Sequence, residues 1–187
     1  MKQLDLVETN VLGLRLLRPR DAEALISEQE FERDEFLPYW AELWPSALEL
    51  AAVVEARDVA GLRVLELGCG LGVPSLVAAR AGAHVLATDW ADDAVALLRE
   101  NALRNEIDLD TAVVDWRRAD ALLERAPFDL VLAADVLYER RYVDLLLDLL
   151  PRLGGEILVA DPGRPFAKRF LERWDVERVG DRVFRLL

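Results

Sequence analysis

Three carboxylates and a glycine-rich turn stand near the ends of apolar segments, where buried strands would stop. Glu66 precedes residues 68–72, which read Gly-Cys-Gly-Leu-Gly, while Asp89 and Asp135 each follow an apolar run. Glycine permits positive φ and lets a ligand approach the backbone, and the N–H groups that open a following helix are unpaired. This arrangement predicts a ligand-binding site at one edge of a sheet.

Asp89 follows the glycine turn at about the 20-residue separation at which a carboxylate can hold both ribose hydroxyls of a nucleoside. A glycine turn by itself is also typical of a tight strand-to-helix connection. Because the carboxylate stands at the expected distance along the chain, we expect a nucleoside cofactor rather than a connection alone.

The glycine spacing and Glu66 narrow the choice of cofactor. The dinucleotide pattern G-x-G-x-x-G would need its third glycine at Val73, and the phosphate loop G-x-x-x-x-G-K-[ST] is absent. A carboxylate at Glu66 would repel a pyrophosphate but attract the α-amino group of a methionine moiety. S-adenosylmethionine is therefore the expected cofactor, and a nicotinamide-dependent oxidoreductase is the less favoured alternative.

These motifs resemble those of the class I, seven-β-strand methyltransferases that depend on S-adenosylmethionine, whose first motif is E-x-G-x-G-x-G. Asp135 and Tyr138 match the [DE]-x-x-[YF] motif of the branch that contains many protein-lysine methyltransferases. Residues 38–45 and 161–165 are similar to the lysine methyltransferases that modify the β subunit of electron-transfer flavoprotein. The resemblance covers about residues 38–170.

The resemblance implies a role for each candidate site residue. Asp135 would capture and aim an acceptor lysine, and Tyr138 would form part of the channel wall. Of the implied cofactor contacts, Trp44 would form a wall at the methionine end and Trp116 a wall at the adenine side. Asp89 would hold the ribose, and Ala134 would make a backbone contact. The loop itself would supply the backbone of Gly68, Cys69 and Gly70, with Glu66 beside the α-amino group. Asp115 is a lower-ranked candidate for the adenine amino group, and Asp135 and Tyr138 could instead cap and pack the following helix.

The expected function is S-adenosylmethionine-dependent N-methylation of lysine side chains in a protein substrate. A small-molecule amine or pyridine N-methyltransferase, acting on a nicotinamide-like acceptor, would share the same cofactor half of the site. A non-catalytic S-adenosylmethionine-binding module is less favoured, because such a module has no need of the acidic and aromatic acceptor motif.

Composition restricts the partners. The net charge of −12 opposes binding to nucleic acid or an anionic membrane, whereas a basic protein segment would be attracted. The start of the chain fits neither a signal nor a transit peptide, no apolar stretch reaches membrane-spanning length, and a cytoplasmic location is expected. Cys69 and His84 are the only residues of their types, so no metal site is expected. A monomer is plausible, although the sequence leaves the oligomeric state open.

Strand and helix patterns alternate from residue 62 onward and predict an α/β fold. Expected strands end at residues 68, 89, 116, 134 and 160. Helices are expected at 74–81, 92–105, 142–150 and 166–174, and Pro151 would stop the third of them. By resemblance the sheet is Rossmann-like, seven-stranded and mostly parallel, with helices on both faces. Residues 176–187 themselves predict an antiparallel carboxyl-terminal hairpin that turns at Gly180 and Asp181.

The 187 residues predict one methyltransferase domain, in which residues 56–187 form the catalytic core and residues 1–55 form a helical and aromatic extension flanking the active site. Asp21 can cap a first helix, and Pro45 suits the first position of a helix at 46–54. Aromatic residues are dense between these helices: Phe31, Phe36, Tyr39, Trp40 and Trp44. Phe31 and Phe36 are expected to anchor the segment to the core.

Overall fold

The computed structural model describes residues 4–25 and 38–187 and contains a seven-stranded sheet of order β5-β4-β3-β6-β7-β9-β8. Its strands are β3 (Arg63–Leu67), β4 (His84–Asp89), β5 (Asp110–Val113), β6 (Leu130–Ala134), β7 (Glu156–Ala160), β8 (Val176–Arg178) and β9 (Val183–Leu186). The first five run parallel, and β9 pairs antiparallel with β7 and β8. The chain winds from β3 out to β5 and returns to β6 on the other side of β3. The strand order therefore reverses between β3 and β6, the place where open α/β sheets bind ligands.

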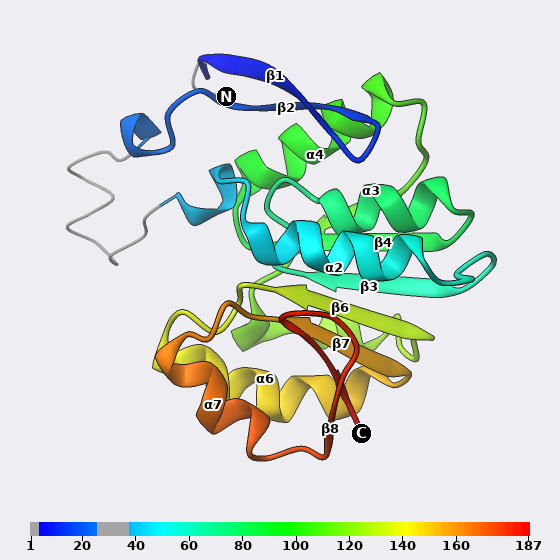
Figure 1. Cartoon of the computed structure of the whole chain (residues 1–187), viewed down its shortest axis with the longest axis vertical. Coiled ribbons are helices and arrows are strands. Elements are labelled where there is room, and N and C mark those ends of the chain that lie inside the picture. The colour runs from blue at the N-terminus through cyan, green and yellow to red at the C-terminus, as the bar shows by residue number, and fades with distance from the viewer. Residues whose placement is uncertain (1–3, 26–37) are drawn as a thin grey trace.

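Helices cover both faces of this sheet (Figure 1). One face carries α2 (Pro45–Glu55), α3 (Val73–Arg80) and α4 (Asp92–Arg104), and the other carries α5 (Asp120–Leu123), α6 (Arg140–Leu153) and α7 (Pro165–Leu171). Successive strand residues point to opposite faces, so Val64 packs into the core on the first side and Leu65 into the core on the second. The predicted fold class is confirmed.

Several predicted element boundaries are wrong, among them the end of α7, which lies at Leu171 rather than at residue 174. Helix α6 continues past Pro151 to Leu153, because the side chains of both Leu150 and Leu153 are fully buried in the core. Strand β5 ends at Val113 rather than at Trp116, which lies in the short 3-10 helix η3 (Trp116–Arg118). In α6, the packing of the last turn compensates for the backbone hydrogen bond that Pro151 cannot donate.

The amino-terminal segment contains a β-hairpin that the sequence patterns did not indicate. Strands β1 (Leu6–Val11) and β2 (Leu14–Pro19) pair antiparallel, and β2 packs on α4. The turn places Leu12 and Gly13 at φ angles of 48° and 75°. A leucine is uncommon in this conformation, so the usual two-residue turn signal is missing.

Asn101 of α4 holds the hairpin in place. Its buried side chain accepts a hydrogen bond from the Leu17 N–H at 2.7 Å and donates one to the Leu17 carbonyl at 2.9 Å. The edge of β2 is thus paired by a side-chain amide, which supplies one donor and one acceptor to the strand.

The expected helix starts are partly seen. Asp21 Oδ1 accepts hydrogen bonds from the backbone of Glu23 at 2.9 Å and of Ala24 at 3.3 Å, where the 3-10 helix η1 (Glu23–Leu25) begins. The continuation of that predicted helix beyond residue 25, and Phe31 and Phe36 with their expected anchoring role, lie outside the described residues. Pro45 opens α2 as expected, and α2 packs on α3 and the sheet. The division at residue 55 stays a prediction.

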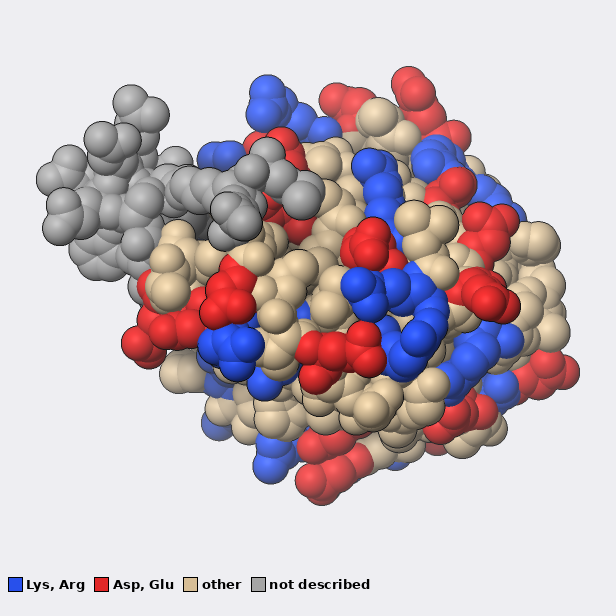
Figure 2. Space-filling view, turned by 90° about the horizontal axis from the view of Figure 1, so that it is seen from above, with Lys and Arg blue, Asp and Glu red and all other residues tan. Residues whose placement is uncertain are grey.

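Acidic and basic side chains are interspersed on the face that carries the amino-terminal hairpin (Figure 2). Ion pairs on this side of the molecule include Arg104 with Glu8 at 3.2 Å and Arg80 with Glu55 at 2.8 Å. In the part of the chain that the structure describes, no helix is both long and apolar enough to cross a membrane.

Candidate active site

A cavity of about 370 Å³ lies at the carboxyl ends of the central parallel strands, where the strand order reverses. Every candidate site residue from the sequence lines it: Trp44, Glu66, Gly68, Cys69, Gly70, Asp89, Trp116, Ala134, Asp135 and Tyr138. These residues come from five separate stretches of the chain. The sheet brings them together because parallel strands end at one edge.

Two glycines of the loop stand where a side chain would crowd the residues around the cavity. Gly68 has a φ of +64°, and a Cβ there would lie 3.0 Å from Val136 Cγ1 and 3.5 Å from the Trp116 ring. Gly70 has a φ of +50°, and its Cβ would lie 3.1 Å from the Trp40 carbonyl. Glycine at these positions keeps backbone and cavity in direct contact, which suits a cofactor held by the loop.

Asp89 is hydrogen-bonded to this loop. Its buried carboxylate accepts hydrogen bonds from the backbone N–H of Gly70 at 2.9 Å and of Ala91 at 3.0 Å. Burial raises the pKa of Asp89 above its ordinary value, and the backbone hydrogen bonds act in the opposite direction. The carboxylate connects the end of β4 to the turn after β3 and can accept further hydrogen bonds from a ligand.

Glu66 is buried beneath the loop and bonded to the start of α3. Its Oε2 accepts a hydrogen bond from the Ser75 backbone at 3.0 Å and another from the Ser75 hydroxyl. Burial is the largest influence on this carboxyl and raises its pKa to about 8. Glu66 is therefore mostly protonated at neutral pH, and the expected attraction to an α-amino group requires that the incoming ammonium lower this pKa.

The raised pKa of Glu66 predicts a specific dependence of stability on pH. The pKa of Glu66 is about 8 in the folded protein, compared with the ordinary 4.5. The contribution of its protonated form to the free energy of unfolding is therefore complete below pH 4.5 and is lost as pH rises through 8. The glutamine of Glu66→Gln stays neutral at every pH. We therefore expect the free energy of unfolding of the variant, relative to that of the wild type, to be a few kcal/mol higher at about pH 9 than at about pH 5. Urea unfolding at both pH values measures this difference. The control is Glu100→Gln at an exposed position of α4. If both variants follow the wild-type profile, the assigned pKa is wrong.

Aromatic rings form one wall of the cavity. The centroids of Tyr39 and Tyr138 are 5.0 Å apart, those of Tyr138 and Tyr142 are 5.1 Å apart, and those of Tyr142 and Trp116 are 5.4 Å apart. Tyr142 packs against the core and also lines the cavity. Burial raises the pKa of Tyr138 well above its ordinary range, so Tyr138 keeps its proton.

The adenine-side candidates lie in the turn after β5. Trp116 lines the cavity from η3, while the Asp115 carboxylate accepts from the Arg117 backbone at 3.0 Å and pairs with the Arg117 guanidinium at 2.9 Å. The hydrogen bond from the Arg117 side chain is the main cause of the lowered pKa of Asp115. Asp115 therefore already serves as the cap of η3.

Asp135 follows β6 in a left-handed conformation, with a φ of +57°. Its backbone N–H donates to the Ala160 carbonyl at 2.9 Å, and its buried side chain receives the Arg164 guanidinium. The alternative that Asp135 caps the next helix is not realised, because Glu139 occupies the N-cap of α6 and no side chain caps that helix. Asp135 Oδ2 has no hydrogen-bond partner and is shielded from solvent.

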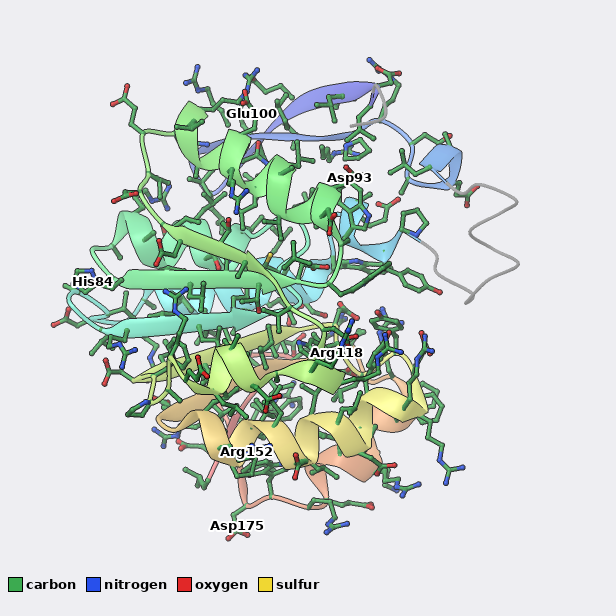
Figure 3. The ribbon with its side chains drawn as sticks, turned by 180° about the vertical axis from the view of Figure 1, so that it is seen from behind. His84, Asp93, Glu100, Arg118, Arg152 and Asp175 are labelled. Carbon is green, nitrogen blue, oxygen red and sulfur yellow. The ribbon has the colours of Figure 1, made fainter. Side chains whose placement is uncertain are left out.

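The remaining titratable candidates contribute no metal site. His84 lies at the beginning of β4, at the end of the sheet away from Arg118, which lines the cavity (Figure 3). Within residues 4–25 and 38–187, no cluster of three or more His, Cys, Asp or Glu side chains could hold a metal ion. Burial raises the pKa of the Cys69 thiol in the glycine loop, so this sulfur stays protonated.

The doubly wound sheet, the glycine loop and Asp89 at the strand-order reversal are typical of a class I methyltransferase. Residues 34–169 match the family described as lysine methyltransferase, and the chain belongs to this family. The match confirms the expected family and, with it, the expected cofactor S-adenosylmethionine. The glycine cradle and the Asp89 carboxylate suit that cofactor.

The names of the curated relatives include more than one methyl-accepting residue, lysine and histidine among them. The electron transfer flavoprotein beta subunit lysine methyltransferase of Xenopus laevis is 36% identical over 137 residues, which cover 68% of this chain and 53% of that protein. The protein-lysine methyltransferase METTL21E of Bos taurus is 32% identical over 75% of this chain and 55% of its own length. A histidine protein methyltransferase 1 homolog of Dictyostelium discoideum is 32% identical over 51% of this chain and 33% of its own. The chain thus spans about half the length of the first two relatives.

Solved structures share the fold. The 16S rRNA N2 G1207 methyltransferase of T. thermophilus, in complex with AdoMet and guanosine, has a TM-score of 0.69 and 19% identity, and covers 97% of this chain and 49% of its own. A ribosomal protein L11 methylase from Lactobacillus delbrueckii subsp. bulgaricus has a TM-score of 0.57 and 25% identity, with coverages of 75% and 76%. At 19% identity the first likeness concerns the fold alone.

Proposed function

We propose that this chain is a protein-lysine N-methyltransferase that uses S-adenosylmethionine. The observation that carries the proposal is the buried Asp135, whose Oδ2 has no partner, in the same cavity as the glycine loop and Asp89. A buried carboxylate oxygen without a donor is costly, and an acceptor amine would supply that donor. The names of the lysine methyltransferase relatives support the same acceptor.

When bound, S-adenosylmethionine supplies a sulfonium methyl group that an amine can attack in line. The amine must be neutral, and a lysine with a pKa of about 10.4 is mostly protonated at neutral pH, a deficit of roughly 4–5 kcal/mol. A carboxylate at Asp135 would by itself stabilise the ammonium form. The aromatic wall acts in the opposite direction, because loss of water around the amine favours its neutral form.

The residues of the acceptor side would then orient the amine. Asp135 accepts a hydrogen bond from it, and the rings of Tyr39 and Tyr138, with centroids 5.0 Å apart, restrict the path of the lysine side chain. Alignment of the two reacting atoms can supply much of the acceleration. Tyr138 remains protonated throughout, since burial raises its pKa, and it serves as a wall rather than a base.

Methyl transfer from labelled S-adenosylmethionine to a cell extract tests the proposal. Extract proteins are offered either untreated or with their lysine amines chemically blocked, and the labelled residues are identified after hydrolysis. We expect labelled methyl-lysine in the untreated proteins and none in the blocked ones. Label in methyl-histidine or methyl-arginine would assign a different acceptor. Label confined to small molecules would favour a metabolite N-methyltransferase, and saturable binding without any transfer would favour a binding module.

A further inference from the structure

Arg164 reaches the acceptor side of the site from the turn after β7. Asp161 Oδ1 accepts hydrogen bonds from the backbone N–H groups of Gly163 at 2.8 Å and of Arg164 at 2.7 Å. Gly163 adopts a φ of +95°, which lets the chain reverse before Pro165 opens α7. Strands β6 and β7 lie side by side, so this turn stands next to Asp135 at the end of β6 (Figure 1).

The guanidinium of Arg164 is held on two sides. Nε and Nη2 each lie 2.6 Å from Oδ1 of Asp135, and Cζ lies 5.2 Å from the ring centroid of Trp44. An aromatic face attracts a guanidinium, so Trp44 supports the arginine from the opposite wall. The side chains of Arg164 and Asp135 are 25% and 5% exposed, which makes this the most buried ion pair among the described residues.

Both donors converge on one carboxylate oxygen. A guanidinium commonly engages both oxygens of a carboxylate in a parallel fork, but here Oδ1 accepts the hydrogen bond from Nε and forms the ion pair with Nη2, while Oδ2 has no hydrogen-bond partner. Arg164 thus fixes the orientation of the Asp135 carboxylate and leaves its second, buried oxygen without a hydrogen-bond partner. The pair is neutral as a whole, so an acceptor amine does not enter beside an uncompensated carboxylate.

We propose that Arg164 is a positioning residue for methyl transfer, which holds Asp135 through Oδ1 so that Oδ2 receives the acceptor amine. The inference rests on the proposed function, because it needs an amine acceptor at Asp135. It assigns a role to the Asp-Pro-Gly-Arg-Pro segment at residues 161–165. Arg164 acts through Asp135 and touches no reacting atom in this arrangement.

Steady-state kinetics of Arg164→Ala and Arg164→Lys, with the wild type and exposed Arg169→Ala as controls, test the role. We expect kcat of Arg164→Ala to fall by about 100-fold, as a misplaced reactive group does, while the KM for S-adenosylmethionine changes only a few-fold. Arg164→Lys keeps the charge and should recover part of the rate. Added guanidinium ion should restore part of the activity of Arg164→Ala, which a purely structural defect would not allow.

Coupling to Asp135 is the second readout. In an Asp135→Asn background, Arg164→Ala should lower kcat no further, because the group that the arginine positions has already been replaced. Independent, multiplicative losses would overturn the proposal, and so would an unchanged or increased kcat in Arg164→Ala alone. If Arg164→Ala fails to fold, the same cycle with Arg164→Lys decides. A wild type that transfers no methyl to lysine overturns the proposed function and this role together, whereas an active wild type with fully active variants overturns only the role of Arg164.

Discussion

Asp135→Asn should reduce methyl transfer to lysine by about 100-fold or more while leaving cofactor affinity within a few-fold of the wild type. The substitution removes the charge and replaces one carboxylate oxygen by a donor, so the amine loses its acceptor. Asparagine is the suitable replacement, because Asp135 has a φ of +57° and asparagine tolerates that region far better than alanine. Radiolabel transfer and calorimetric titration with S-adenosylhomocysteine measure the two quantities.

The control for this prediction is Asp144→Asn, which removes a carboxylate from an exposed position of α6. It should match the wild type in both measurements. Asp135→Ala should also lose transfer, with an added loss of stability from backbone strain and from the unpaired Arg164. If Asp135→Asn methylates the natural acceptor at the parental rate, the capture of the amine by Asp135 is wrong.

Asp89→Asn should weaken cofactor binding by roughly 1.5–3 kcal/mol, which corresponds to about 10- to 150-fold in Kd. The wild-type carboxylate receives the N–H groups of Gly70 at 2.9 Å and Ala91 at 3.0 Å. An asparagine can accept only one of them and turns an NH2 group toward the other. The glycine loop then loses its anchor, and the ribose contact expected of Asp89 loses its charge.

Calorimetric titration with S-adenosylhomocysteine checks this second prediction, with exposed Asp92→Asn as the matched control. Acidification should imitate the variant in the wild type. Because burial raises the pKa of Asp89, its carboxylate takes up a proton at a higher pH than an exposed aspartate does, and affinity should fall as pH drops through that value. Equal affinities for Asp89→Asn and the wild type would remove Asp89 from the cofactor site.

The cofactor half of the site could be predicted from the sequence because its signals are local. The glycine loop follows directly on β3, and Asp89 ends the next strand, so spacing along the chain is enough to bring them together once the sheet is parallel. The carboxyl-terminal hairpin was likewise predicted from its own residues and is confirmed as β8 and β9. Each depends on a short stretch of chain.

The acceptor half could be predicted only in part. Asp135 and Tyr138 were found by their motif, but the partner of Asp135 stands 29 residues further along the chain at Arg164. Tyr142 has the helical spacing of a core residue, and only its position next to Tyr138, with ring centroids 5.1 Å apart, shows that it also lines the cavity. No periodicity distinguishes these two uses.

By itself, the sequence indicated the class of protein, the order of the strands from β3 onward, and the cavity residues of the glycine loop, Asp89 and the Asp135 motif. Glycine conformations, strand ends and hydrophobic periodicity depend on near neighbours in the chain and are therefore readable without a fold. Only the tertiary structure decided that Glu66 is buried with a pKa of about 8, that β1 and β2 pair on α4, and that Arg164 holds Asp135 by one oxygen. Burial, side-chain pairing and charge state depend on which distant segments pack together, and the same residues would behave differently against other neighbours.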